Sequence, residues 1–574
     1  MLKRFWTYFK KDRIYLIGSF VCVTLESMFE MVIPLIMADI IDVGVAAGDK
    51  NYILQKSFAM VGCALVSLLL GSLYAHFAAR AGQGFGAELR KTLYRKIQGF
   101  SFASMDHFSP SSLITRLTGD ITVLINAVCN GIRPMVRGPV MMILGLFMTI
   151  TMSPQLALVF VIATPVLALC LFLILRKLGP VYGKMQKALD QVNSVVQENL
   201  TAIRTVKSYV RGGSEIRKFG QANENFRQSS EQAFHYAALN LPCFQFVMYG
   251  TILCILWFGG NFIRQGTMRI GELTGFLSYV MQILNSLMMI SNVFLMLSRS
   301  MTSAGRIFEV LDMPVDMVDG TGSRMVEHGS IVFEHVYFKY RPTAKEFVLS
   351  DISLQIRAGW TVGIIGGTGS AKSSLVQLIP RLYDVTAGSL KIDGVDVKEY
   401  PVGQLRESVG MVLQKNTLFS GTIRENLRWG NPNATEAELD WACRIACVDE
   451  FLSRMPEGYE TQLGQGGVNV SGGQKQRLCI ARALLKRPRI LIFDDSSSAV
   501  DMATEAKIFS RLSETLNDTT KIIITQRVRA IEDADCIVVL DNGKISAAGT
   551  HDQLLESNPI YQDIYGLQKK GATA

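Results

Sequence analysis

Six long apolar stretches lie in the first half of the chain and alternate with polar segments of unequal length. A helix crosses the hydrocarbon core of a bilayer with about 20 predominantly apolar residues, so each stretch predicts a membrane span. The third stretch is short, and we expect its helix to begin earlier, where Arg133 and Arg137 interrupt the apolar signal. The predicted spans are 14–41, 58–79, 138–152, 155–175, 244–263 and 271–297.

Two long polar connections, 80–137 and 176–243, follow the second and fourth spans. Segments within them, such as AGQGFGAELRKTLYRKIQ and KMQKALDQVNSVVQENLTAIRTVKSYV, have a helix-like pattern but are too polar for lipid. We therefore expect the membrane helices to continue into water. They would turn at tips near 106–114 and 209–217.

Basic residues are distributed unevenly between the connections. The three short connections carry only Lys50, Lys56, Arg264 and Arg269, whereas the N-terminus and the long connections carry many more. Because Lys and Arg are enriched on the cytoplasmic side of membrane proteins, both termini and both long connections are predicted to be cytoplasmic.

Composition agrees with a membrane protein. Of 574 residues, 49% are hydrophobic and only 19% are charged, which disfavours a wholly soluble protein. The excess of 58 Lys and Arg over 49 Asp and Glu is explained by basic cytoplasmic loops. No Arg-rich patch with interleaved aromatic residues accompanies it, so we expect no nucleic-acid partner.

Glu26 and Glu30 lie inside the first predicted span, four residues apart and so on one helix face. Carboxylates within a membrane are costly and need a partner or a wet cavity. One interpretation is a contact in the substrate path. The alternative is an interhelical hydrogen bond or a position near the outer interface.

The second half of the chain has a different pattern. A segment rich in Pro, Gly and Asp, LDMPVDMVDGTGS, predicts a linker. Beyond it, short β-branched runs such as RILIFDD and KIIITQ alternate with helical stretches. This alternation predicts an α/β domain with a mostly parallel sheet.

WTVGIIGGTGSAKSSLVQLI predicts a strand, a glycine-rich loop and a helix, the context of a phosphate-binding loop. Lys372 would reach the outer phosphates and Ser373 would bind Mg²⁺. Ala371 departs from the strict pattern, which has Gly before the Lys, and its methyl group is strained only if φ is positive. The candidate phosphate-binding residues are Gly366, Gly367, Thr368, Gly369, Ser370, Ala371, Lys372, Ser373 and Ser374.

Further motifs follow in a fixed order, and with them the chain resembles the half-exporters among the ATP-binding-cassette (ABC) transporters along essentially its whole length. The resemblance implies that Tyr340 stacks on adenine and that Gln414 is the Q-loop glutamine, which senses the metal and the γ-phosphate and takes part in hydrolysis. It also implies that Asp494 organises Mg²⁺ together with Ser373 and Gln414, and that 498–501 form a D-loop. VSGGQ matches the signature that closes on the ATP of the opposite subunit, with Val470 in place of the usual Leu. Its contacts would be Ser471, Gly472, Gly473 and Gln474.

The resemblance also implies an architecture. The fold would be an all-α, six-helix membrane domain of the type IV (type I exporter) class, followed by an α/β P-loop ATPase domain. The tips would be coupling helices that dock into the cassettes. The expected divisions are an elbow helix on the inner leaflet at 1–12, a membrane domain at 13–300, a linker at 301–328 and a cassette at 329–574.

Two positions depart from the family pattern. Asp495 replaces the usual glutamate that polarises the attacking water, and Gln526 replaces the histidine that contacts the γ-phosphate. One methylene withdraws the carboxylate by about 1 Å, and a misplacement of that size can cost about 100-fold in rate. Glutamine can donate a hydrogen bond but cannot carry the charge of an imidazolium.

These departures resemble one subunit of the heterodimeric exporters, which pair a degenerate ATP site with a competent one. The sequence therefore predicts a translocase ATPase with low activity at its own site, using ATP and Mg²⁺, in a bacterial plasma membrane. Its partners would be a second, different half-transporter, membrane lipids and an amphipathic small molecule such as a drug or lipid. The alternatives are a homodimeric lipid or drug exporter, and an ATP-gated channel or regulatory subunit.

Overall fold

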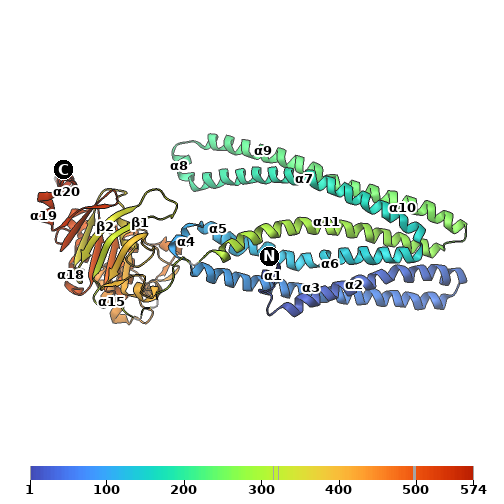
Figure 1. Cartoon of the computed structure of the whole chain (residues 1–574), viewed down its shortest axis with the longest axis horizontal. Helices are drawn as coiled ribbons and strands as arrows, with labels where there is room; N and C mark the ends of the chain where they lie inside the picture. Colours follow the sequence, from blue (N-terminus) through green and yellow to red (C-terminus); the bar gives the residue numbers. More distant parts are fainter. Residues whose placement is uncertain (1, 315, 321, 323, 496–499, 573–574) are drawn as a thin grey trace. The chain divides into compact units, whose positions relative to one another are not determined.

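The computed structural model describes residues 2–314, 316–320, 322, 324–495 and 500–572 (Figure 1). The chain divides into two compact units. The first comprises residues 1–98 and 110–312, and the second comprises residues 99–109 and 313–574. The second unit thus contains a short segment from the first long polar connection.

The first unit is helical. Its elements are α1 (Leu2–Phe5), α2 (Arg13–Asp39), η1 (Ile40–Val45), α3 (Lys50–Gln98), α5 (Pro110–Thr115), η2 (Arg116–Asp120), α6 (Ile121–Met152), α7 (Pro154–Thr201), α8 (Ile203–Ser208), α9 (Gly212–Ala238), α10 (Asn240–Arg264) and α11 (Ile270–Asp312). Figure 1 shows α2, α3, α6 and α11 running alongside one another, and α7 alongside α9.

Within the described residues, six helical stretches are long and apolar enough to cross a membrane. They confirm the six-span prediction. The third stretch covers Pro110–Met152 and so begins before Arg133, as expected from the interrupted apolar pattern. Five of these stretches, 33 to 53 residues long, extend well past the 20 or so residues that a bilayer requires, because their polar ends continue as helix.

Small residues let the central helices approach closely. A methyl group on Gly145 of α6 would lie 2.7 Å from the Ile283 side chain of α11, and one on Gly138 would lie 2.9 Å from Ile290. Such close approach is typical of membrane helix packing, where the hydrophobic effect contributes little. Tyr279 of α11 is fully buried, and its hydroxyl donates to the carbonyl of Met31 in α2 at 2.7 Å.

The N-terminal segment differs from the helix expected at 1–12, because α1 ends at Phe5 and turns follow it. Phe9 stacks on Phe85 of α3 with ring centroids 4.5 Å apart. The Arg4 guanidinium lies 4.1 Å from the centroid of the Phe308 ring in α11 and pairs with Asp312. Aromatic packing on α3 and α11 therefore holds this segment.

The last helix of the first unit is longer than the sequence indicated. α11 continues to Asp312 and so covers the first twelve residues of the expected linker. Ile307 and Val310 are fully buried there, and the Arg306 side chain pairs with the buried Asp120 of η2. The helix ends before Pro314, where a proline disfavours helical backbone in the preceding residue.

The described residues of the second unit form three sheets. One is four-stranded in the order β2-β1-β4-β5, one is six-stranded in the order β12-β11-β3-β10-β9-β6, and one pairs β7 with β8. The strands are β1 (Ile331–Phe338), β2 (Leu349–Ile356), β3 (Thr361–Ile365), β4 (Ala387–Ile392), β5 (Val395–Asp396), β6 (Val409–Val412), β7 (Gly421–Thr422), β8 (Gln462–Leu463), β9 (Ile490–Asp494), β10 (Thr520–Ile524), β11 (Cys536–Asp541) and β12 (Lys544–Gly549). In the six-stranded sheet only β12 runs antiparallel to its neighbour.

Helices surround these sheets. They are α4 (Phe102–Asp106), α12 (Lys372–Gln377), α13 (Val402–Ser408), α14 (Ile423–Leu427), α15 (Glu436–Ile445), α16 (Asp449–Leu452), η3 (Gly458–Glu460), η4 (Gln465–Gly467), α17 (Gly472–Leu485), α18 (Met502–Thr515), η5 (Val528–Ala530), α19 (His551–Ser557) and α20 (Pro559–Ala572). The predicted α/β domain is confirmed.

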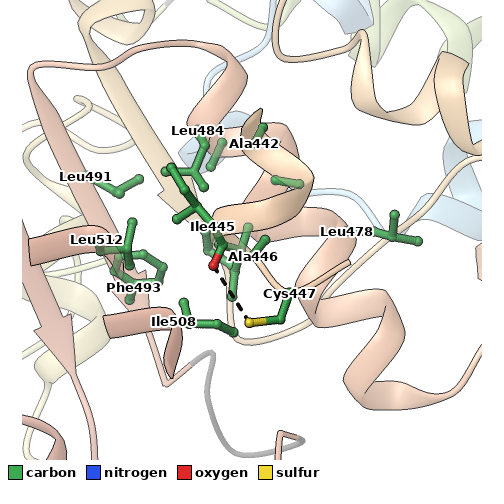
Figure 2. Close-up of a cluster of buried hydrophobic side chains, with 14 of the residues drawn as sticks. Ala442, Ile445, Ala446, Cys447, Leu478, Leu484, Leu491, Phe493, Ile508 and Leu512 are labelled. Atoms are coloured by element: carbon green, nitrogen blue, oxygen red, sulfur yellow. Dashed lines mark hydrogen bonds between the residues drawn. The ribbon is translucent and has the colours of Figure 1, made fainter. Parts of the chain in front are cut away.

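A cluster of buried apolar side chains joins several of these helices to the parallel sheet (Figure 2). Ala442 and Ile445 of α15 pack there with Leu484 of α17, Phe493 of β9 and Leu512 of α18. This cluster therefore links α17, whose first turn carries the signature, to β9, which ends at Asp494.

The helix α4 belongs to the second unit and is tied to it by side-chain hydrogen bonds. The Tyr383 hydroxyl donates to Asp106 Oδ2 at 2.8 Å. The hydroxyls of Ser101 and Ser104 donate to the carboxylate of Asp316 at 2.7 and 3.1 Å. The sequence predicts tips near 106–114 and 209–217. The short helices next to these segments, α4 and α8, begin four and six residues earlier, at Phe102 and Ile203.

Candidate nucleotide-binding site

Four neighbouring parallel strands end at one edge of the six-stranded sheet. They are β3, β10, β9 and β6, in that order. Immediately after them come the glycine-rich loop, Gln526, Asp495 and Gln414, respectively. Ligands of open α/β sheets bind at this carboxyl edge, so the topology gathers residues that are distant in sequence.

The glycine-rich loop between β3 and α12 has a backbone that larger residues would disturb. A methyl group on Gly366 would lie 2.1 Å from the carbonyl oxygen of Leu540. Gly369 has a φ of +86°, in the left-handed region that favours glycine. The tip of the loop, 367–369, is exposed, and Ser370 is buried beneath it.

Lys372 places its cationic group inside this loop. Its Nζ donates to the carbonyls of Gly366 and Gly367 at 2.9 and 2.8 Å. Burial lowers the pKa of Lys372, while the nearby carboxylates of Asp495 and Asp494 oppose that shift. The ammonium therefore faces any phosphate that the loop encloses.

Ala371 has left-handed backbone, with φ +72° and ψ +24°. The question that the sequence left open is thereby answered, because a methyl group at positive φ carries a strain of about 1–2 kcal/mol that glycine avoids. Its side chain packs at the margin of a buried apolar cluster. The substitution thus strains the loop without preventing its formation.

Ser373 and Asp494 meet at the base of the loop. The Ser373 hydroxyl donates to Asp494 Oδ1 at 2.6 Å. Burial raises the pKa of Asp494, and the hydrogen bond from Ser373 acts against that increase. A hydroxyl and a carboxylate are hard oxygen donors of the kind that Mg²⁺ prefers, so this pair fits the metal that the sequence predicts.

Asp495 lies between two side-chain amides. Gln414 Nε2 donates to Asp495 Oδ2 at 3.4 Å, and Gln526 Nε2 donates to the same oxygen at 3.3 Å. The backbone of Asp495 is left-handed, with φ +46°, and its N–H donates to the carbonyl of Ile524 at 3.1 Å. The structure thus brings together the three residues that were predicted to act in hydrolysis.

Tyr340 lies two residues after β1 of the four-stranded sheet, and its side chain contacts the helix that follows the glycine-rich loop. Its hydroxyl lies 2.8 Å from Ser374 Oγ, and its ring meets that of Tyr383 edge-on with centroids 5.1 Å apart. Tyr340 also lines a cavity of about 320 Å³, together with Tyr383 and Ser101. A partly exposed ring beside the phosphate loop is suited to stacking on a base.

The signature forms the N-terminus of α17. Ser471 caps this helix: its Oγ accepts from the N–H of Gln474 at 3.3 Å, and Gln474 Oε1 accepts from the N–H of Ser471 at 2.9 Å. Gly472 and Gly473 form the first turn. Capping uses the Ser471 hydroxyl as an acceptor, so its proton remains able to donate to another group.

Comparison with known proteins assigns both halves of the chain. Residues 16–287 match the ABC transporter transmembrane region, and residues 349–498 match the ABC transporter family. An uncharacterized ABC transporter ATP-binding protein, YfiB of Bacillus subtilis, is 39% identical over 95% of this chain and 94% of its own. The chain belongs to the ABC transporters.

Two further similarities extend this assignment. The ATP-dependent lipid A-core flippase of Chromobacterium violaceum is 29% identical over 99% of this chain and 98% of its own. The structure of a bacterial Atm1-family ABC exporter with ATP bound shares the fold, with a TM-score of 0.84, 24% identity, and coverage of 97% of this chain and 99% of that one. This ABC transporter therefore has the half-exporter arrangement, a multi-pass membrane domain followed by one ATP-hydrolysing cassette.

Residues 498 and 499 of the predicted D-loop, 498–501, lie outside the described residues. The described end of that loop, Asp501, caps α18 by accepting from the N–H of Thr504 at 2.9 Å. Glu505 of this helix is buried and pairs with Arg527, which follows Gln526. The D-loop helix of this ABC transporter is thus tied to the segment that carries Gln526.

In the membrane domain, both predicted carboxylates have basic partners on α6. Glu26, which is almost fully buried, pairs with Arg133, and Glu30 Oε2 lies 2.5 Å from Arg137 Nη2. Arg137 Nη1 also lies 3.6 Å from Glu26 Oε1. The cluster is therefore an interhelical arrangement of two carboxylates and two guanidinium groups with no net charge.

In the apolar pattern of the sequence, these arginines stand out only as an interruption of the third span. Their spacing held more information, because Arg133 and Arg137 are four residues apart, as are Glu26 and Glu30. Two packed helices that carry opposite charges at the same four-residue spacing can form ion pairs along their contact.

Gln568, which contacts the segment around Gln526, has no comparable signal in the sequence, because it lies in a polar helix about 40 residues further along.

Proposed function

We propose that this ABC exporter works as one subunit of a heterodimer that moves amphipathic compounds. In this proposal its own phosphate loop binds ATP in a degenerate site, while its signature completes the competent site of a different half-transporter. The observation that carries the proposal is the environment of Asp495. The short carboxylate is held between two neutral amides, those of Gln414 and Gln526.

That environment binds a carboxylate well but suits hydrolysis poorly. A general base must reach the attacking water, and Asp495 is one methylene shorter than the family's glutamate. Hydrolysis of ATP also depends on positive charge around the departing phosphate. The amide of Gln526 donates a hydrogen bond without that charge.

The other residues support binding. Lys372 would contact the outer phosphates, Tyr340 would stack on adenine, and Ser373 and Asp494 would hold Mg²⁺ with the help of Gln414. When bound, Mg²⁺ would neutralise phosphate charge. Because these groups are retained while Asp495 and Gln526 are altered, we assign the site to binding rather than to fast turnover.

The second tip of the membrane domain supports a dimer. α8 and the adjoining ends of α7 and α9 form an apolar groove of about 610 Å³. Val210 and Ile216, which line this groove, expose most of their surface. Exposed apolar patches of this kind mark interaction sites, and we assign this one to the cassette of the second subunit.

We further propose that Glu26 and Glu30 lie in the substrate path. Their ion pairs with Arg133 and Arg137 give a polar contact between α2 and α6 that has no net charge. Such a contact suits the polar end of an amphipathic compound. Glu26→Gln would leave Arg133 without its counter-charge and should reduce transport several-fold, whereas Glu26→Gln combined with Arg133→Gln should recover part of it. Uptake of a fluorescent amphiphile into inside-out vesicles measures both variants. Equal transport by all three proteins would exclude this assignment.

The proposed location is the bacterial plasma membrane, with both termini and the cassette in the cytoplasm. The uneven distribution of Lys and Arg supports this orientation. Proteolysis of sealed inside-out and right-side-out vesicles tests it, because the cassette should be cleaved only in the inside-out preparation.

The experiment that tests the degenerate site is ATP hydrolysis by the chain alone and together with its partner. We expect slow hydrolysis by the chain alone and fast hydrolysis by the pair. Vigorous hydrolysis by the chain alone would favour a homodimeric lipid or drug exporter instead.

A channel or regulatory subunit is a proposal from another class, because a degenerate site suits gating by binding energy alone. Transport separates the two. ATP-dependent accumulation of a dye against its gradient in inside-out vesicles supports export. A passive ion current gated by ATP, without accumulation, supports the channel.

A further inference from the structure

A side chain of the C-terminal helix α20 holds the segment that carries Gln526 from outside the sheet. Gln568 Nε2 donates to the carbonyl oxygen of Gln526 at 2.6 Å. Gln568 Oε1 accepts from the N–H of Val528 at 2.9 Å. One side-chain amide thus spans Arg527 and satisfies the backbone on both sides of it, much as a neighbouring strand would.

The helix that provides this amide is itself firmly anchored. Tyr561 of α20 is fully buried, and its hydroxyl lies 2.7 Å from His551 Nδ1. His551 Nε2 in turn lies 3.4 Å from the carboxylate of Glu532, just beyond η5. The helix α20 thus contacts the region after β10 directly through Gln568 and indirectly through His551 of α19, and these two connections can hold the intervening backbone in one conformation.

From this geometry we infer that Gln568 is a positioning residue that orients Gln526 toward Asp495 and the terminal phosphate of ATP. A glutamine side chain has more rotatable bonds than the histidine it replaces, so its amide is placed accurately only when its backbone is fixed. The bonds from Gln568 restrain the two peptide groups that follow Gln526 in the chain, one on each side of Arg527. The inference rests on the proposed contact of Gln526 with the phosphate, but not on how fast the site hydrolyses ATP.

The decisive variant is Gln568→Met, which keeps the length of the side chain and removes both hydrogen bonds. Gln562→Met is the matched control, since Gln562 lies on the same helix but donates to the carbonyl of Leu555. Both are made in the full chain in lipid nanodiscs. Hydrogen–deuterium exchange then reports on residues 525–530, and displacement of a fluorescent nucleotide gives the affinities for ATP and ADP.

We expect Gln568→Met to speed exchange in residues 525–530 and to reduce the ratio of ATP to ADP affinity by about tenfold, the effect of one or two net hydrogen bonds. Affinity for ADP and the behaviour of Gln562→Met should be unchanged. An unchanged ratio, or an equal loss of ATP and ADP affinity, would overturn the inference, because the latter indicates general destabilisation.

A third measurement separates this inference from the proposed degenerate site. If the unmodified chain hydrolyses ATP rapidly by itself, the degenerate-site proposal fails, but Gln568→Met should then still lower kcat/KM for ATP about tenfold. An unchanged kcat/KM would overturn the positioning role as well.

Discussion

The cassette presents two parts of the ATP machinery, and they differ in how closely they follow the family pattern. At the sheet edge, Ala371 is strained, Asp495 is one methylene short, and Gln526 is neutral. At the start of α17, Ser471 and Gln474 form a complete capping box around two glycines. In our proposal, the first part retains its binding groups but has altered hydrolytic groups, whereas the second retains Ser471, both glycines and Gln474, with Val470 in place of the usual Leu.

This contrast has a consequence for any dimer in which each ATP lies between one phosphate loop and the opposite signature. The two parts of one chain then serve different ATP molecules. Alterations at the sheet edge would then weaken only the site on this chain's loop, while its signature would act on the partner's nucleotide. Degeneracy in one cassette is thus compatible with fast turnover by the pair.

The largest effect on hydrolysis by the pair should come from a mutation in the signature at the start of α17. Ser471→Ala removes the hydroxyl donor and should reduce hydrolysis by the pair by about 100-fold or more, the typical cost of losing one donor to a transition state. Asp495→Asn in the same pair should change it less than about twofold. Steady-state phosphate release measures both.

Ser471→Thr is the control, because threonine keeps both the hydroxyl and the helix cap. It should retain most of the activity. If Asp495→Asn abolished turnover and Ser471→Ala did not, the assignment of the two parts would be reversed.

The next largest effect on hydrolysis should come from restoring the residues of the family pattern at the sheet edge. Asp495→Glu combined with Gln526→His restores the longer carboxylate and a ring that can be protonated. We expect hydrolysis by the chain alone to rise by about 100-fold, matching the rate lost through a displacement of about 1 Å. The single variants should each achieve less. No increase in the double variant would place the defect elsewhere in the site.

The sequence was sufficient to predict the six spans, the α/β cassette and the residues at the sheet edge. The reason is physical: apolar length and the alternation of strands with helices are local signals. The strand order β3-β10-β9-β6 then brings Gln414, Asp495 and Gln526 together. Each of them directly follows a strand or lies within two residues of its end.

Features that depend on backbone angles or on distant contacts could not be predicted. The positive φ of Ala371 decides whether its methyl group is strained, and no residue type reveals that angle. The extension of α11 through 301–312 depends on burial of Ile307 and on the pairing of Arg306 with Asp120. The contact of Gln568 with the segment around Gln526 likewise depends on tertiary packing.

A smaller effect tests whether the sheet edge of this chain, which carries Asp494, binds Mg²⁺. Asp494→Asn should weaken ATP binding to this chain about tenfold in the presence of Mg²⁺, because the neutral amide attracts the cation less. With Mg²⁺ removed by EDTA the sign should reverse, since a carboxylate near phosphate repels it. Isothermal titration with and without Mg²⁺ measures this. Equal losses in both conditions would show that Asp494 has a purely structural role.

The smallest effect concerns Ala371, whose departure from the family pattern should matter least. Ala371→Gly relieves the left-handed strain, but glycine gains backbone freedom in the unfolded chain, so the net change in stability should be below about 1 kcal/mol. We expect ATP affinity to rise by no more than about threefold, and hydrolysis by the chain alone to stay slow. Nucleotide titration and thermal unfolding measure these quantities. A 100-fold gain in hydrolysis would instead identify the methyl group, and not Asp495 or Gln526, as the cause of slow turnover.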